Sequence, residues 1–394
     1  MTSAARILPI LLLSATSLRA KPQQPNLNGE FPIPNGRVLS PPIVLPVGEC
    51  AKAVHITGYI SHAIIRVFAH GTELIGTANP YFAETDITLT RQLNAGESIT
   101  ATQEVIGKVS SPSVDPMIVS SYPVTLNKPI ALAPVYACGR VVPADHLNAG
   151  TQISAFQQGN SAAIGNANAT QPWQPIVTSA LVPNTNVFVR QTACRGVAGH
   201  EKHADSAAIP VSPSPTTVPP PVVEKPLVGA DAMTLHGLLT GSGMDVSESG
   251  GVIGSGLATG DRNYVAVPKI TSAPVTAIQK LCTSSSPSTP VTPTTTLSTP
   301  EILPPVCEGT HYVTVRGAYI NSILVLFRNG IIAGMAGAKL GDVKMALGGG
   351  VVWNLGDEIY VRQYVGPIQS QISASVYANC SGQNRRGPLF IRPV

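Results

Sequence analysis

Charged and aromatic residues are scarce in this sequence of 394 residues. Asp, Glu, Lys and Arg make up 12% of it, Phe, Trp and Tyr 5%, and the formal net charge is +4. Nucleic-acid surfaces need clustered cations with stacking aromatics, so we expect no nucleic-acid partner. Long apolar runs are missing as well. No stretch approaches the roughly 20 residues of a membrane-spanning helix, so no membrane span is expected.

Patterns that carry catalysis or bind metals are missing too. The six cysteines include no C-x-x-C pair, no G-x-S-x-G segment occurs, and the glycine-rich "ALGGGVVW" at 346–353 lacks the lysine of a phosphate-binding loop. The densest ionisable cluster, "HEKHAD" at 200–205, lacks the H-E-x-x-H spacing of a helical zinc site and is interpreted as a solvated loop. We therefore expect no metal, no cofactor and no enzymatic activity.

Glycine and proline, in contrast, are abundant at 36 residues each, a composition typical of strands and turns. The chain starts with "MTSAARILPILLLSATSLRA", in which Arg6 precedes an apolar stretch and then small residues. This resembles a secretory signal over 1–20, followed by a disordered segment at 21–40. The alternative is the disordered N-terminus of a fragment. On the first interpretation the protein is secreted or held at the cell surface.

One hairpin sequence occurs four times: "RVFAHGTELIG" (66–76), "SAFQQGNSAAIG" (154–165), "DVSESGGVIG" (245–254) and "LFRNGIIAG" (326–334). The glycines of the four turns are Gly71, Gly159, Gly250 and Gly330. A strand ending in glutamine follows each hairpin, at Gln103, Gln191, Gln279 and Gln363. Both landmarks recur about every 80–91 residues, so the chain contains four copies of one domain.

Each copy holds about seven short strands with alternating apolar positions, such as Ile65 and Val67. Glycine stands second in each turn, where a two-residue hairpin loop requires positive φ. The sequence therefore predicts an all-β protein, four tandem immunoglobulin-like antiparallel β-sandwiches joined by Pro/Ser/Thr-rich linkers. The expected segments are domains at 41–126, 127–212, 224–294 (diverged) and 304–382, linkers at 213–223 (Pro-rich) and 295–303, and a tail at 383–394.

The repeated pattern is G-x-V-x-V-x-x-x-G-x-x-I-G, then an apolar strand ending in Gln, then Ser/Pro and a Val-rich strand. It is carried by "GYISHAIIRVFAHGTELIG", "LNAGESITATQEVIGKVSSPS" and "MIVSS", with weaker counterparts later in the chain. It resembles the bacterial immunoglobulin-like (Big-type) tandem repeats of surface and secreted proteins over roughly residues 41–382. The third copy departs from it, with Ser247 where the other copies have Phe. Such bacterial repeats serve as spacers, adhesins and appendages to enzymes, so the resemblance indicates the fold more than the function. The tandem period, the proline-rich linkers, the signal-like start and the missing catalytic set predict a non-enzymatic exported structural or adhesive protein, an extended array that acts as a spacer or surface-binding stalk.

Six cysteines are candidates for disulfides: Cys50, Cys138, Cys194, Cys282, Cys307 and Cys380. Cys138 with Cys194 is a plausible bond inside copy two, and Cys307 with Cys380 inside copy four. Cys50 and Cys282 are then left without a local partner, unless Cys282 pairs with Cys307 across the linker. Six cysteines allow fifteen connectivities, and all remain open. Disulfides would fit an exported protein.

Three aromatic residues are candidates for binding. Tyr81 and Phe82 in "ANPYFAE" and Trp173 in "TQPWQP" follow their hairpins at similar places, where they could stack on a sugar or fill a partner's pocket. Packing in a core or loop is the favoured alternative. The four glutamines could form a ligand row, but buried amides that bond to loop backbone explain them better. The possible partners are a glycan, a surface protein, or other copies of the chain through exposed sheet edges.

Overall fold

The computed structural model describes residues 36–123 and 125–380. This part of the chain forms 31 short strands and two single-turn 3-10 helices, η1 (Gly36–Val38) and η2 (Gly348–Gly350). The predicted all-β fold of antiparallel sandwiches is confirmed. The predicted signal at 1–20, residues 21–35 and the predicted tail at 383–394 lie outside the described residues.

Eight sheets follow one another along the chain as four pairs, here called the first to fourth sheet pairs. Each pair encloses its own hydrophobic cluster. In the first, Ile65, Val67 and Ile99 are completely buried, as their alternation along the strands predicts. The burial of one face of each sheet therefore sets the register within every pair.

The first two pairs each combine a three-stranded sheet with a larger one. The first pair, with orders β1–β2–β5 and β4–β3–β6–β7 plus β8 on β6, contains β1 (Ile43–Val44), β2 (Ala53–Thr57), β3 (Ile64–Ala69), β4 (Glu73–Ala78), β5 (Glu84–Thr88), β6 (Ser98–Val105), β7 (Lys108–Val109) and β8 (Met117–Ile118). The second, with orders β14–β11–β9 and β10–β17–β15–β12–β13 plus β16 on β15, contains β9 (Ile130–Ala131), β10 (Val135–Tyr136), β11 (Val141–Asp145), β12 (Gln152–Gln157), β13 (Gly165–Asn168), β14 (Gln174–Val177), β15 (Asn186–Ala193), β16 (Lys202–Asp205) and β17 (Ile209–Ser212).

The third pair has two three-stranded sheets, and the fourth repeats the plan of the first. The third, with orders β18–β19–β22 and β21–β20–β23, contains β18 (Val222–Glu224), β19 (Ala232–His236), β20 (Gly243–Glu248), β21 (Gly251–Leu257), β22 (Asn263–Ala266) and β23 (Val275–Lys280). The fourth, with orders β24–β25–β28 and β27–β26–β29–β30 plus β31 on β29, contains β24 (Glu301–Leu303), β25 (Tyr312–Arg316), β26 (Ile323–Arg328), β27 (Ile331–Gly337), β28 (Val343–Ala346), β29 (Glu358–Val365), β30 (Ile368–Gln369) and β31 (Val376–Tyr377).

Three of the four repeated hairpins turn as their sequences predict. His70 and Gly71 have φ of 50° and 77°. Ser249-Gly250 (51° and 82°) and Asn329-Gly330 (50° and 83°) also have positive φ at both turn residues, as in type I′ loops. The prediction is wrong for the second copy, where β12 and β13 are joined by residues 158–164. Gln158 does not adopt a positive φ, so the strands part before the glycine and a longer loop forms.

The predicted linkers are partly built into the sandwiches. β18 begins inside the expected linker 213–223, and β24 lies inside 295–303. Each of these strands pairs with the central strand of the next three-stranded sheet, β19 or β25. Backbone N–H and C=O groups that lie beside a sheet edge gain hydrogen bonds when they pair with it. The linker residues nearest each sandwich therefore form an additional strand of that sandwich.

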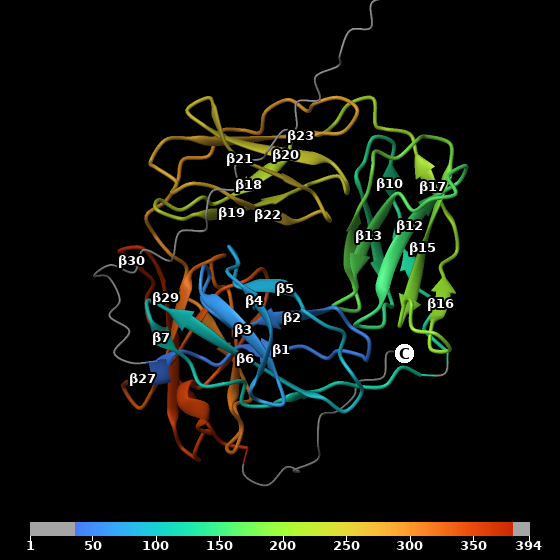
Figure 1. Ribbon diagram of the computed structural model, residues 1–394. Coiled ribbons are helices and arrows are strands. Elements are labelled where there is room, and N and C mark those ends of the chain that lie inside the picture. The colour runs from blue at the N-terminus through green and yellow to red at the C-terminus, as the bar shows by residue number, and fades with distance from the viewer. Residues whose placement is uncertain (1–35, 124, 381–394) are drawn as a thin grey trace, which may run out of the picture.

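The four pairs form a closed cluster and not an extended array, so that expectation is wrong. Figure 1 shows the first pair, in blue, against the fourth, in orange and red, with the third above them and the second to one side. The N–H of Ser40 donates to the carbonyl of Met335 at 3.0 Å, and the N–H of Gly337 donates to that of Tyr59 at 2.8 Å. Val325 and Met335 belong to the hydrophobic cluster of the first pair.

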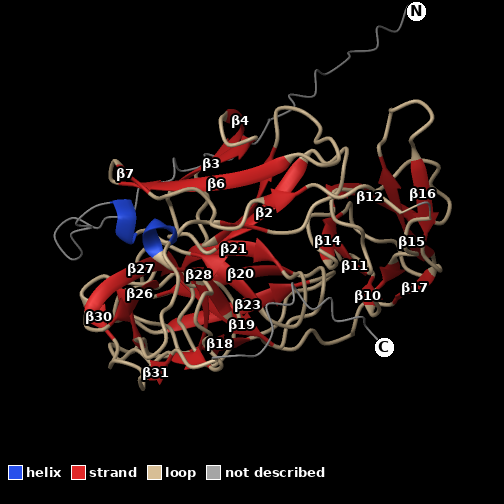
Figure 2. Ribbon diagram, turned by 90° about the horizontal axis from the view of Figure 1, so that it is seen from below, coloured by secondary structure: helices blue, strands red, loops and turns tan. Residues whose placement is uncertain are grey.

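The segment just before the first pair is also part of this contact. Residues 36–40 were expected to be disordered, yet Leu39 and Ser40 are fully buried. The Ser40 hydroxyl donates to the carbonyl of Ala346 at 2.6 Å. η1 lies beside η2 (Figure 2), and a Cβ on Gly348 would stand 2.1 Å from the carbonyl oxygen of Arg37. Burial of Leu39 stabilises this segment against the fourth pair. The close approach of Arg37 is possible because residue 348 is a glycine.

Candidate functional site

Disulfides join neighbouring sheet pairs. Cys50 at the start of the first pair is bonded to Cys194 in the second, and Cys138 at the start of the second to Cys282 in the third. The expected Cys138–Cys194 bond and the alternative Cys282–Cys307 bond are therefore wrong. The beginning of one sandwich lies against the end of the next sandwich. The two cysteines of the second repeat, Cys138 and Cys194, are therefore bonded to two different neighbouring sandwiches. Cys307 is bonded to Cys380 within the fourth pair.

The four repeated glutamines are completely buried and bond to backbone, as expected. Gln103 accepts from the N–H of Ile60 at 2.9 Å through Oε1 and donates to the carbonyl of Ser40 at 2.6 Å through Nε2. The equivalent carbonyls are those of Asn127, Pro219 and Ser298, which accept from Gln191, Gln279 and Gln363. All four carbonyls precede their sheet pair in sequence. Each glutamine thus fixes the incoming segment onto its own sandwich.

Two of the candidate binding aromatics lie in a junction between sheet pairs. The Tyr81 hydroxyl is within hydrogen-bond distance of the carbonyls of Asp231 and Val267, at 2.7 and 2.8 Å. Phe82 packs on Tyr264 of the third pair with ring centroids 4.3 Å apart. Burial raises the pKa of Tyr81 well above its ordinary value, so the hydroxyl remains a donor. Both rings therefore contribute to holding the first and third pairs together.

Polar side chains from three sheet pairs meet at this junction. His62 Nε2 lies 3.0 Å from a carboxylate oxygen of Asp231, and the Asn321 amide donates to the other oxygen at 3.2 Å. The three residues come from the first, third and fourth pairs. Sequence reasoning missed them, because no pattern in the sequence brings positions so far apart together.

A second polar junction joins the first pair to the second. His55 Nδ1 lies 2.8 Å from Asp86, and Thr170 of the second pair donates to the same carboxylate at 2.5 Å. Burial lowers the pKa of His55, but hydrogen bonds and charges of Asp86 and Glu84 outweigh it and raise the pKa above 6.5. The pKa of Asp86 is shifted the opposite way: burial raises it, and the His55 and Thr170 bonds lower it below its ordinary value. The two shifts favour the ionised form of the His55–Asp86 pair, which lies in the first sheet pair where it meets the second.

Trp173, the third candidate, remains accessible. Its side chain is 40% exposed, in the loop just before β14. The neighbouring Gln174 and Gln171 contact Asp86 and His55 of the first pair. Trp173 therefore lies at the rim of the first–second junction, with its ring available to solvent.

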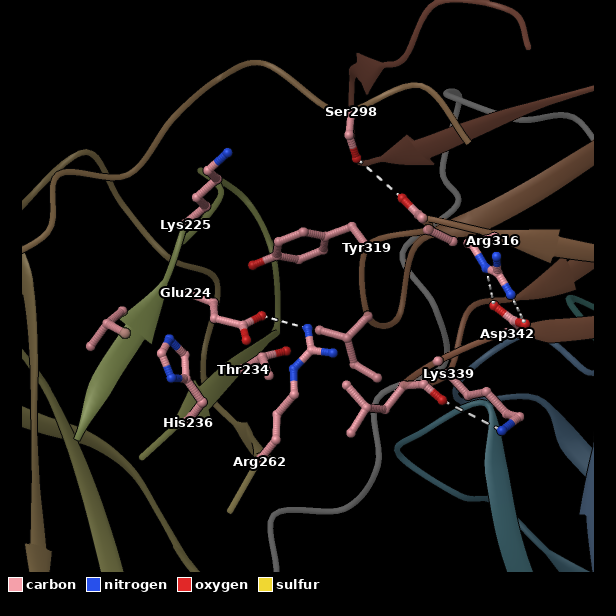
Figure 3. Close-up of a pocket in the computed structure, with 16 residues that line it drawn as sticks. Glu224, Lys225, Thr234, His236, Arg262, Ser298, Arg316, Tyr319, Lys339 and Asp342 are labelled. Carbon is pink, nitrogen blue, oxygen red and sulfur yellow. Dashed lines mark hydrogen bonds and ion pairs between the residues drawn. The ribbon is translucent and has the colours of Figure 1, made fainter. Parts of the chain in front are cut away.

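A cleft of about 600 Å³ separates the third and fourth pairs. Figure 3 shows Glu224, Thr234 and His236 along one side and Arg316, Lys339 and Asp342 along the other, with Arg262 and Tyr319 between them. Thr234 and His236 belong to β19, and the residues opposite come from the end of β25 and the loop before β28. The cleft thus lies between the outer face of one sandwich and loops of another.

Ion pairs fix the charged side chains on the cleft walls. Arg262 Nη2 lies 2.6 Å from Glu224, and Arg316 forms two bonds with Asp342, at 3.0 and 2.9 Å. The hydrogen bond from Arg316 lowers the pKa of Asp342 below its ordinary value, so this pair is ionised. Lys225, at the mouth of the cleft, forms no ion pair with any described residue.

Beyond Lys225 and Tyr319 lies a second cavity of about 510 Å³. Its walls include Thr292, Thr294 and Thr296 from the segment between the third and fourth pairs. The Tyr319 hydroxyl donates to the carbonyl of Ala232 at 3.2 Å, and its backbone N–H donates to Gln363. Tyr319 is thereby held in place as the partition between the two cavities.

Within residues 36–123 and 125–380, no three His, Cys, Asp or Glu side chains gather to hold a metal ion. Part of "HEKHAD" was expected to be a loop, but residues 202–205 form edge strand β16, in which Asp205 bonds to Arg190 at 2.6 Å. Pairing with β15 supplies hydrogen bonds to the backbone N–H and C=O groups of these residues, which a free loop would leave to solvent. No helix in the described part of the chain is long and apolar enough to cross a membrane.

No protein-family model matches the chain, and no curated protein matches it either. Similar solved structures include arrays of fibronectin-III or immunoglobulin domains. The central fibronectin-III array of a RIM-binding protein covers 66% of this chain and 98% of its own, with 16% identity and a TM-score of 0.18. The BSP domain of a biofilm-associated protein covers 89% and 98%, with 9% identity and a TM-score of 0.21. The four N-terminal immunoglobulin domains of Dscam1 isoform 9.44 cover 87% and 99%, with 10% identity and a TM-score of 0.21.

Proposed function

We propose that the chain is a bacterial, exported, non-enzymatic structural or adhesive protein, in which four immunoglobulin-like domains are locked into one rigid body. The domains are those expected from the repeat, with the segments at 36–40, 222–224 and 301–303 added to the sandwiches. The rigid body presents its outer surfaces to a partner at the cell surface or outside the cell.

The observation that carries this proposal is the pair of disulfides between successive sandwiches. A flexible spacer needs free linkers, whereas here Cys50–Cys194 and Cys138–Cys282 tie three sandwiches together. The buried contact of Ser40 with Met335 adds the fourth. Disulfides persist in oxidising compartments, which supports export.

Small-angle scattering of the native and reduced protein tests the rigid body. A compact chain of this length has a radius of gyration of about 21 Å from its size alone. We expect a value near this for the native protein and an increase after reduction. A native radius of a four-domain string would refute the rigid body. Cell fractionation that leaves most of the protein in the cytoplasm would refute export.

A second function, recognition of a glycan or a surface protein, is favoured by the exposed ring of Trp173. Trp and Tyr are the residues that most often anchor such contacts. Binding to a panel of glycans and cell-surface proteins should weaken in Trp173→Ala. The matched control is Tyr377→Ala, which removes an aromatic side chain that is 55% exposed on another sandwich. Equal effects of the two variants would argue against a site at Trp173.

A further inference from the structure

We propose that the cleft between the third and fourth sheet pairs binds an acidic oligosaccharide, a sugar chain bearing carboxylate or sulfate groups. The inference adds a ligand to the proposed adhesive function and does not require Trp173. It rests on the arrangement of cations, of unused donor atoms and of hydroxyl groups around the cleft.

Cations reach the cleft from both walls. Arg262 and Lys225 belong to the third pair, and Arg316 belongs to the fourth. Among the described residues, Arg262 uses only Nη2 for its ion pair, and Arg316 uses Nε and Nη2. Nη1 of each guanidinium is therefore free to donate. Guanidinium groups bind carboxylate and sulfate-like oxyanions through such paired N–H donors.

The carboxylates in the cleft orient the arginines and leave a cationic excess. Glu224 and Asp342 each accept from one arginine, while Lys225 remains unpaired and exposed. A ligand carboxylate placed between the walls would meet N–H donors from opposite sides. A neutral ligand could accept a hydrogen bond from Lys225 but would form no ion pair with it, so the charge balance favours an anion.

The rest of the lining combines hydroxyl groups with some apolar surface, as a sugar ring requires. Val223 and Ile320 are buried in the sandwiches, at 5% exposure each. Leu340 is partly exposed in the same lining and can contact the apolar face of a sugar ring, so the tetraglutamate probe below separates a peptide from a sugar. Hydroxyl groups of Thr292 and Thr296, which are exposed in the adjoining cavity, are available to hydrogen-bond sugar hydroxyls.

The two cavities share Lys225, Ser298 and Tyr319. A sugar chain longer than one ring could therefore pass Tyr319, with its acidic group at the arginines and a further ring beside the threonines. This arrangement predicts that a trisaccharide or longer binds more tightly than a single uronic acid.

Calorimetric titration of the full chain tests the inference with four probes: a tetragalacturonate, a heparin-derived tetrasaccharide, maltotetraose as the neutral match, and a tetraglutamate peptide. We expect the acidic sugars to bind and to weaken as salt is added, and maltotetraose not to bind. Binding of the sulfated probe alone, or of the carboxylated one alone, would identify the acidic group. Equal binding of tetraglutamate would overturn the choice of a sugar.

Lys225→Gln should raise the Kd for the acidic sugar about tenfold, as expected for loss of one charge-assisted contact, and Lys225→Glu more. Lys225 is exposed, so both variants should fold. Lys108→Gln, which removes an exposed lysine from the first pair, is the matched control and should bind as the native protein does. An unchanged Kd in Lys225→Glu would overturn the site. Scattering on the same samples separates this outcome from failure of the rigid body.

Discussion

Replacement of a repeated glutamine by leucine tests whether these side chains fix the segment that enters each sandwich. In Gln103→Leu, the N–H of Ile60 and the carbonyl of Ser40 lose the partners that lie 2.9 and 2.6 Å away. Both groups are deeply buried. An unsatisfied buried group costs about 1–3 kcal/mol. After allowance for the apolar side chain that fills the space, we expect a loss of about 2–4 kcal/mol.

The loss should be confined at first to the segment around Ser40 and the loop at Ile60. Hydrogen exchange measures it directly, because the Ile60 amide is released when the loop opens. At about 1.4 kcal/mol per tenfold, exchange at Ile60 should accelerate about 30- to 700-fold. Gln158→Leu is the matched control, since Gln158 is exposed and bonds only to Asn186, and it should change stability by less than about 0.5 kcal/mol.

Unchanged exchange at Ile60 in Gln103→Leu would refute the reasoning, because it would mean that another group satisfies the amide. The same experiment can be repeated at Gln191, Gln279 and Gln363, where Oε1 accepts from Asn148, Leu239 and Tyr319. At these three sites a hydroxyl, of Thr151, Ser242 or Ser322, also donates to Oε1 and would lose its partner. We therefore expect an effect at least as large as at Gln103.

Three further predictions follow from the junctions. Cys50→Ser with Cys194→Ser opens a loop of sequence separation 144 and should lower the free energy of unfolding by up to about 5 kcal/mol, read from denaturant unfolding; no change would mean that the bond does not form. Gly337→Ala places a Cβ 2.7 Å from Ala83 and should lower the melting temperature through a cost of about 1–3 kcal/mol, whereas Gly251→Ala, with its nearest atom at 3.7 Å, should be tolerated. Because the pKa of His55 is raised on folding, protonation of His55 stabilises the folded protein fully below pH 6.5, and this stabilisation is lost as pH rises through the folded pKa. Melting temperatures measured across this pH range should fall less in His55→Gln than in the native protein. His70→Asn, at an exposed turn, is the control and should show the native pH dependence.

The fold of each sandwich was predictable because its signals are local. Alternation at Ile65 and Val67 sets which face is buried, and Asn329-Gly330 suits a two-residue turn. The buried glutamines were predictable for the same reason, since their place on the strand follows from alternation. The second hairpin was missed because Gln158 precedes the glycine in place of a residue that tolerates positive φ.

The packing of the sandwiches was not predictable, because it depends on positions with no local pattern. Gly337 reads as an ordinary strand glycine, and only the structure shows that it faces Tyr59 and Ala83. Packing in a core or loop was the favoured interpretation of Tyr81 and Phe82, but nothing in the sequence indicated that they pack on another sandwich. Their contacts with Asp231 and Tyr264 lie at a separation of ~150 residues or more, a distance over which sequence periodicity carries no information.

The disulfides between sandwiches repeat one geometric step, and this leads to a final prediction. Cys50 and Cys138 stand three residues before β2 and β11 with φ of 59° and 65°, and the equivalent residue before β19 is Gly229, with φ of 82°. Their partners Cys194 and Cys282 stand three residues after a repeated glutamine. In the fourth pair that position is Gly366.

The third and fourth sandwiches lack this bond because glycine occupies both positions. The neighbours of these glycines, Leu227 and Val365, belong to one hydrophobic cluster, so the step from the third to the fourth sandwich resembles the two before it. Gly229→Cys with Gly366→Cys should therefore form a disulfide, visible as a linked peptide in mass spectra and as the absence of free thiol. Gly229→Cys with Ile106→Cys, which uses the equivalent turn of the first sandwich, should leave two free thiols. If both double variants stay reduced, the third and fourth sandwiches do not pack in the relative orientation that the two native disulfides join in the earlier sandwiches.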